Sequence, residues 1–86
     1  MDNRARLWAS FEPLTLTRIR PEHNERRFYA LAMTVDLFGN IVLIRNWGRI
    51  GTSGRQREET HSNVTAAAEN MERLMRKKCG RGYVDR

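Results

Sequence analysis

The sequence has few of the features that stabilise secreted domains or hold a chain in a membrane. It contains one cysteine, Cys79, and two prolines among its 86 residues. A single cysteine excludes an internal disulfide, so packing must stabilise the fold, as is usual in a reducing compartment. No apolar run approaches the roughly 18 residues of a membrane-spanning helix, and the charged N-terminal segment is unlike a signal peptide. We therefore expect a cytoplasmic protein without membrane contact.

Acidic residues are outnumbered by basic ones. Sixteen Lys and Arg residues against ten Asp and Glu residues give a formal net charge of +6, and every basic residue except Lys77 and Lys78 is an arginine. Guanidinium groups bind phosphate in a bidentate manner and stack on bases, so this composition favours nucleic acid or another polyanion as the partner. An arginine-rich genome would give the same composition, and the charge balance alone leaves the partner open.

The chain has room for one small core, because it combines 86 residues with 40% apolar residues. We predict a single domain over residues 13–86 and leave residues 1–12 unassigned. Alternating apolar residues predict strands over residues 14–19, 28–35 and 41–47, with a polar loop over residues 20–25. Residues 36–40 are the expected hairpin connection, since Gly39 and Asn40 tolerate a positive φ. The polar run Arg55–His61 predicts a further strand at a sheet edge.

An amphipathic helix is predicted from Val64 onward, with Ser62 or Asn63 as its N-cap. Lys77 and Lys78 suit the negative end of its dipole, and Gly80 is placed to end it. Residues 81–86 either return as a short final strand or lie as an extended tail. The predicted fold class is α+β: a small antiparallel β-sheet of three to five strands with one C-terminal amphipathic helix packed on it.

No catalytic or metal-binding set emerges from the sequence. His23 and His61 lie in separate polar segments, and Cys79 has no partner motif, so no nucleophile and base are paired. One cysteine and two histidines do not match the ligand spacing of a structural zinc site. A P-loop or dinucleotide fingerprint would require a helix directly after residues 48–54, where a polar strand is predicted instead. We expect neither an enzyme nor a bound cofactor or metal.

Three glycines, Gly48, Gly51 and Gly54, predict a tight hairpin corner, because glycine tolerates a positive φ. Closely spaced glycines in a basic loop can also hold phosphate with their backbone N–H groups. The loop is surrounded by one tryptophan and three arginines: Arg45, Trp47, Arg49 and Arg55. Trp47 is either an ordinary core residue or a stacking platform for a base or a sugar.

A wider set of residues resembles the WGR domain family. The resemblance covers about residues 14–84. It rests on Arg27-Phe28-Tyr29, on residues 36–40, on the run from Arg45 to Gly54, on the helix that follows, and on Lys77-Lys78 with Arg81-Gly82-Tyr83. It implies a small antiparallel sheet with one packed helix, and DNA binding near a strand break as in the DNA-dependent poly(ADP-ribose) polymerases. The same resemblance implies that Trp47 packs against the sugar–phosphate backbone at an exposed, 5′-phosphorylated end. Arg49 matches an arginine that contacts other domains in those polymerases, whose catalytic segment has no counterpart in this sequence.

We therefore predict a nucleic-acid-binding module, with DNA favoured over RNA, that binds near a strand end without reading the base sequence. Phosphate contacts of this kind make the affinity strongly salt-dependent. The predicted binding residues are Arg45, Trp47, Gly48, Arg49, Arg55, Lys77, Lys78 and Arg81. The alternative is a protein-interaction module or a homodimer, which would use the strand Arg55–His61 or the side chains of Trp8 and Phe11.

Overall fold

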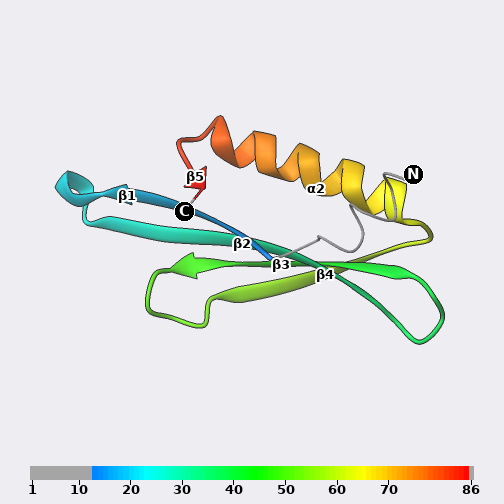
Figure 1. Cartoon of the computed structure of the whole chain (residues 1–86). Helices are drawn as coiled ribbons and strands as arrows, with labels where there is room; N and C mark the ends of the chain where they lie inside the picture. The colour runs from blue at the N-terminus through cyan, green and yellow to red at the C-terminus, as the bar shows by residue number, and fades with distance from the viewer. Residues whose placement is uncertain (1–12, 86) are drawn as a thin grey trace.

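In the computed structural model, which describes residues 13–85, five antiparallel strands form one sheet and the helix α2 crosses one of its faces (Figure 1). The strand order across the sheet is β4-β3-β2-β1-β5. The elements follow one another as β1 (Leu14–Arg20), the 3₁₀ helix η1 (Pro21–His23), β2 (Glu25–Val35), β3 (Ile41–Arg49), β4 (Arg55–His61), α2 (Val64–Cys79) and β5 (Val84–Asp85). The predicted α+β class is confirmed.

The central hairpin of β2 and β3 is longer than the sequence pattern predicts. β2 begins at Glu25 rather than at residue 28, and β3 continues through Gly48 to Arg49. Paired residues run without interruption from Val35 opposite Ile41 to Arg27 opposite Arg49. The pairing continues into this polar stretch because backbone hydrogen bonds, rather than apolar side chains, hold two strands together. The extension brings charged residues into the regular sheet.

One side chain organises the turn between β2 and β3. The carboxylate of Asp36 accepts hydrogen bonds from the backbone N–H groups of Phe38 and Asn40, each at 2.9 Å. Desolvation raises the pKa of this carboxyl, but these bonds outweigh it and hold the pKa below its ordinary value of 3.8. A positive φ occurs at Gly39 alone of the predicted pair, so the prediction was wrong for Asn40. The turn thereby sets the register of the whole hairpin.

The connection between β1 and β2 is structured, where the sequence predicts a polar loop. Pro21–His23 form a 3₁₀ turn, and Asn24 closes it with a left-handed φ of 53°. The backbone N–H of Asn24 donates to the carbonyl of Pro21 at 3.0 Å. His23 and Asn24 are thereby held beside the start of β2, toward the end of the sheet that the C-terminus of α2 approaches (Figure 1).

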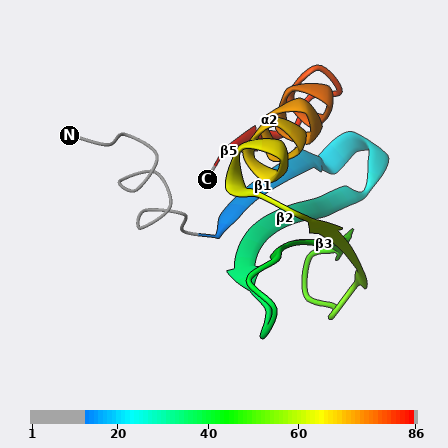
Figure 2. The same cartoon turned by 90° about the vertical axis from the view of Figure 1, so that its right-hand side faces the viewer.

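The core lies between α2 and the sheet. Its buried cluster comes from β1, β2, β3, α2 and the C-terminal segment: Leu16, Tyr29, Leu31, Leu43, Leu74 and Tyr83. Figure 2 shows α2 on one side of the curved sheet, and no other described element covers the opposite side. Because successive side chains of a strand point to opposite faces, every second residue of β2 and β3 faces the helix. This alternation also decides which charged residues lie near the end of α2.

Both ends of α2 are capped. At its N-terminus the side chain of Asn63, rather than Ser62, accepts the N–H of Ala66 at 2.8 Å. At its C-terminus Gly80 follows the last helical residue, as predicted, but keeps a helical φ of −64°. The left-handed residue is Gly82, with a φ of 93°, and the N–H of Tyr83 then donates to the carbonyl of Lys78 at 3.1 Å. The chain reverses there and continues into β5, so of the two alternatives left open the short final strand is the one observed.

We expect Asn63→Ala to lower the free energy of unfolding by about 1 kcal/mol, because it removes the acceptor for a helix N–H that has no other partner. Asn63→Asp keeps an acceptor and should be close to the wild type. Urea denaturation followed by circular dichroism measures both, with Ser62→Ala as the matched control. An equal loss in Ser62→Ala would contradict the assignment of Asn63 as the cap.

Candidate functional site

Three arginines lie side by side across the sheet. Arg18 of β1 is paired with Arg27 of β2, and Arg27 is paired with Arg49 of β3. Directly opposed residues share a face, and the next row on this face contains Tyr29 and Trp47, beside the core. Like charges placed opposite one another destabilise a sheet. The three opposed arginines therefore lower the stability of the sheet, and an anion bound beside them would reduce this loss.

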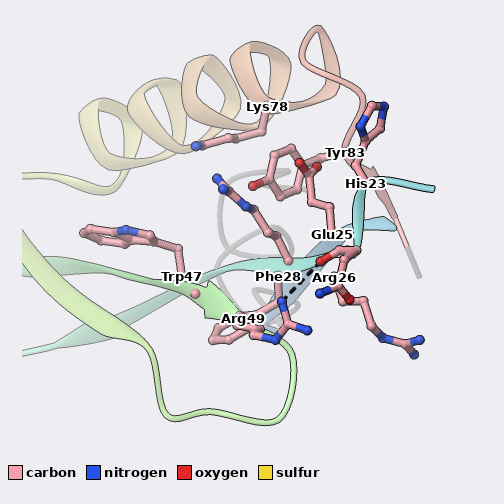
Figure 3. A pocket seen from close by; sticks show the side chains of 11 residues that line it. His23, Glu25, Arg26, Phe28, Trp47, Arg49, Lys78 and Tyr83 are labelled. Carbon is pink, nitrogen blue, oxygen red and sulfur yellow. Dashed lines mark hydrogen bonds between the residues drawn. The ribbon is translucent and has the colours of Figure 1, made fainter. Parts of the chain in front are cut away.

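Only one member of this row has a carboxylate partner among residues 13–85. Arg18 forms an ion pair with Glu25, and its Nη1 also donates to the carbonyl of Arg81 at 2.8 Å. Desolvation raises the pKa of Glu25, but the hydrogen bond and charge of Arg18 hold it below the ordinary 4.5. Arg49 donates from Nη1 to the carbonyl of Asn24 at 3.3 Å, which leaves its charge unneutralised (Figure 3).

Arg27 and Arg49, together with Glu25, border a cavity of about 570 Å³ at the end of the sheet (Figure 3). Its walls come from the β1–β2 connection, the start of β2, the end of β3, the last turn of α2 and the segment after it. They are formed by His23, Asn24, Glu25, Arg26, Arg27, Phe28, Trp47, Gly48, Arg49, Lys78 and Tyr83. Of the predicted residues, this cavity unites Trp47, Gly48, Arg49 and Lys78. Its lining contains four cationic side chains and one carboxylate, which is already paired.

A second, smaller cavity of about 180 Å³ lies between β3 and the end of α2. It is lined by Tyr29, Arg45, Trp47, Leu74, Lys77, Lys78 and Arg81. The predicted residues Arg45, Lys77 and Arg81 therefore lie in this cavity and not in the larger one. Trp47 and Lys78 line both cavities.

Trp47 lies at the border between the core and the two cavities. Its side chain is half-buried and packs against the core cluster, yet it also lines both cavities. The guanidinium carbon of Arg45 lies 6.0 Å from the centre of its ring, within the range of a cation–π contact. An indole held in this way is fixed by the core and still presents part of its surface to a ligand.

The ammonium group of Lys78 lies against two tyrosine rings, those of Tyr29 and Tyr83. Its Nζ lies 4.7 Å from the ring centre of Tyr29 and 5.3 Å from that of Tyr83. Burial lowers the pKa of Lys78 below the ordinary 10.5, and the charges of Arg81, Lys77, Arg18 and Arg27 lower it further. An ammonium group that is desolvated among other cations is stabilised when an anion binds beside it.

Two of the predicted binding residues, Arg45 and Arg55, do not line the larger cavity. Arg45 already forms an ion pair with Glu59, with 2.6 Å between Nη2 and Oε1, and Asn70 donates to the other Glu59 oxygen at 2.9 Å. Arg55 is paired with Trp47 across the sheet but lines neither cavity. The structure therefore separates Arg55 from the cluster of cations around the larger cavity.

The glycines of the β3–β4 turn have two different roles. Gly51 and Gly54 adopt positive φ values of 96° and 71°, as the hairpin corner requires. Gly48 does not, so the sequence-based explanation was wrong for it: a Cβ there would lie 2.8 Å from the Cα of Gly54. A Cβ on Gly54 would lie 2.4 Å from the carbonyl oxygen of Trp47 and 2.8 Å from Cζ of Phe28. The turn folds back closely against β3 and is covered by the Phe28 ring.

The binding residues predicted from the sequence do not include most of the residues that line the larger cavity. The missed lining residues are His23, Asn24, Glu25, Arg26, Arg27, Phe28 and Tyr83. A signal for Arg27 was available, because the predicted turn over residues 36–40 places residue 27 opposite residue 49 when the hairpin is extended. Tyr83 belongs to the Arg81-Gly82-Tyr83 run of the resemblance, but no strand register predicts its place, which depends on how the chain turns after α2.

The family model of the WGR domain matches residues 12–86. One relative is a protein of Sinorhizobium fredii (strain NBRC 101917 / NGR234) described as uncharacterized protein y4dW, with 39% identity over 70 residues. The match covers 81% of this chain and 34% of that relative, so the chain spans about a third of the relative's length. No solved structure matches the chain.

Two further features concern residues 13–85. No three His, Cys, Asp or Glu side chains in this part of the chain are placed to hold a metal ion. No helix in the same range is long and apolar enough to cross a membrane. The predicted docking residues Trp8 and Phe11 lie outside the described residues.

We expect Gly54→Ala to destabilise the fold more than Gly51→Ala. Alanine at either position would need a left-handed φ, which costs about 1–2 kcal/mol, but nothing lies within 4 Å of a Cβ at Gly51. At Gly54 the contacts with Trp47 and Phe28 add a further ~1–3 kcal/mol by analogy with overpacking. Thermal or urea unfolding of both variants measures the difference. Equal losses would mean that the turn does not pack as closely as described.

Proposed function

Since the chain belongs to the WGR domain family, which is generally associated with nucleic-acid binding, we propose that the larger cavity binds the terminal phosphate of a nucleic-acid strand. The observation that carries the proposal is the excess of positive charge at this cavity. Arg26, Arg27, Arg49 and Lys78 line it, whereas its one carboxylate, Glu25, is paired with Arg18. Guanidinium groups bind phosphate in a bidentate manner.

The shape of the site favours a strand end over a continuous duplex. A cavity of about 570 Å³ has the size of a small-molecule site. A terminal nucleotide can enter such a cavity, whereas the middle of a duplex is too wide. The partly exposed ring of Trp47 in the wall suits a sugar or a base, which stacks on an aromatic surface whatever its identity. Contacts with the phosphate, the sugar and the face of a base do not distinguish one base sequence from another.

The finer parts of the proposal follow from the resemblance and from chemistry. DNA is favoured over RNA because the family members that the sequence resembles bind broken DNA. A 5′-phosphate is favoured over a 5′-hydroxyl because it brings additional negative charge to Lys78 and the arginine row. The proposed role is binding, with no catalytic step.

We expect duplex DNA with 5′-phosphorylated ends to bind more tightly than a closed hairpin without free ends. Trp47→Ala and Lys78→Gln should each weaken end binding about tenfold or more, as for the loss of one charged contact or one stacking contact. Log K should fall with log salt at about −0.7 to −0.9 per phosphate neutralised. Fluorescence-anisotropy titration at two salt concentrations measures all three quantities.

The matched control is Arg76→Gln, which removes one positive charge from an exposed position on α2 outside both cavities. It should retain the affinity of the wild type within about twofold, since exposed charges far from the ligand are screened. Lys78→Gln should unfold at no lower a temperature than the wild type, because it removes a desolvated charge. Equal affinity for open and closed DNA, or an equal loss in Arg76→Gln, would refute the proposal.

The affinity should also depend on pH through Lys78. An anion stabilises the ammonium form, and the pKa of Lys78 in the free protein lies below 10.5. As the pH rises from neutral toward 10.5, Lys78 loses its proton before an ordinary lysine does, so the affinity should fall. Lys78→Arg keeps its charge over this range and should show a smaller decline. Identical pH profiles for the two proteins would exclude Lys78 as a phosphate contact.

A protein-interaction role is the second candidate, because two exposed surfaces are suited to contact with another protein. β4 lies at the sheet edge, where one side of its backbone is unpaired within the described sheet, and most of its side chains are exposed. At the β2–β3 turn Leu37 is 99% and Phe38 87% exposed. The titration described above distinguishes the two roles: absent or equal binding to every DNA would favour this second role.

A further inference from the structure

The smaller cavity adjoins the larger one through a shared wall. Trp47 and Lys78 line both, so an indole ring and an ammonium group lie between the two spaces. The other walls of the smaller cavity come from β2, β3, the last turns of α2 and the segment after it. The two cavities are therefore neighbours at Trp47 and Lys78.

The smaller cavity has no carboxylate in its lining. Its four cationic side chains are Arg45, Lys77, Lys78 and Arg81, and among residues 13–85 only Arg45 is paired with a carboxylate, that of Glu59. The helix dipole accounts for lysines in the last turn of α2, but Arg81 lies beyond the helix end. Burial is the main cause of the lowered pKa of Lys78, and the charges of Arg81 and Lys77 lower it further.

Two buried donors of this cavity have no hydrogen-bond partner in the described part of the chain. They are the hydroxyl of Tyr29, a residue that is 3% exposed, and Nε of Arg45. Buried polar atoms are nearly always bonded in folded proteins, so both donors are short of an acceptor, and each would have to turn toward the cavity to reach one there. A water molecule would satisfy the hydroxyl, but it would leave the positive charge uncompensated. A phosphate supplies both acceptor oxygens and negative charge.

We infer that the smaller cavity binds the first internucleotide phosphate of a strand whose terminal phosphate occupies the larger cavity, with the intervening sugar against Trp47. The inference rests on the proposed function and adds to it a second phosphate subsite. The ligand is then an oligonucleotide end of at least two nucleotides, rather than a mononucleotide. Lys77 and Arg81 serve the second subsite alone, because neither lines the larger cavity.

The test combines two changes, one in the ligand and one in the protein. The ligands are 5′-phosphorylated DNA ends that carry one neutral methylphosphonate, at either the first or the fourth internucleotide linkage. The proteins are the wild type, the double variant Lys77→Gln/Arg81→Gln and the charge-matched double variant Arg57→Gln/Arg76→Gln. All four positions are exposed, so the folds should be unchanged, and circular dichroism checks this.

Neutralising the first linkage should weaken binding to the wild type and to the Arg57/Arg76 variant about tenfold, the loss expected for one charge-assisted contact. The same neutral linkage should cost the Lys77/Arg81 variant clearly less than it costs the wild type, because two of the four cations of the smaller cavity are already neutral. The fourth linkage should not distinguish the proteins. An equal cost of the first neutral linkage in all three proteins, or no cost in the wild type, would overturn the second subsite alone. Failure of the wild type to bind any end would overturn the proposed function, and this inference with it.

Discussion

The register of the β2–β3 hairpin is the constraint on which the other features of the site depend. Val35 is paired with Ile41 next to a turn that Asp36 holds with two hydrogen bonds, and from there the pairing continues to Arg27 and Arg49. A slip of one residue would turn every side chain of one strand to the other face of the sheet. Trp47 would then leave the core and both cavities. A turn at one end of the molecule thus determines which charges meet at the other end.

Charge at the site opposes the stability of the fold. The opposed arginines of β1, β2 and β3 repel one another, and Lys78 lies desolvated above the rings of Tyr29 and Tyr83. The rest of the sheet offsets this cost through the apolar cluster below α2 and through the ion pair of Arg18 with Glu25. A domain of this size has a small core, so cations that serve packing alone would be better replaced by apolar residues. Arg27, Arg49 and Lys78 nevertheless line one cavity together, which supports a role in binding an anion.

Much of the fold could be predicted from the sequence, because strand alternation, turn residues and helix caps are local signals. The sequence also predicts part of the site. Trp47, Gly48 and Arg49 are neighbours in the chain, and Lys78 is a cation. The ion pair between Arg45 and Glu59 could not be foreseen, since it depends on the register of β3 with β4 and on Asn70 of α2. Tyr83 was missed because its burial depends on the chain reversal at Gly82, which no apolar period indicates. Local patterns therefore identify the strands and the helix, while contacts between distant segments form the cavity walls.

The run Trp47-Gly48-Arg49 follows from the alternation of a strand that ends in a tight turn. Trp47 and Arg49 face α2 and the larger cavity, whereas Gly48 faces the opposite side, where the backbone of Gly54 returns. Any side chain at Gly48 would push that backbone away, and the ring of Phe28 covers the glycines in its place. The turn can then place the N–H of Ile50 within 2.9 Å of the carbonyl of Arg26. Strand alternation thus places two side chains of the proposed site on one face, and the glycine between them lets the turn pack closely against the other face.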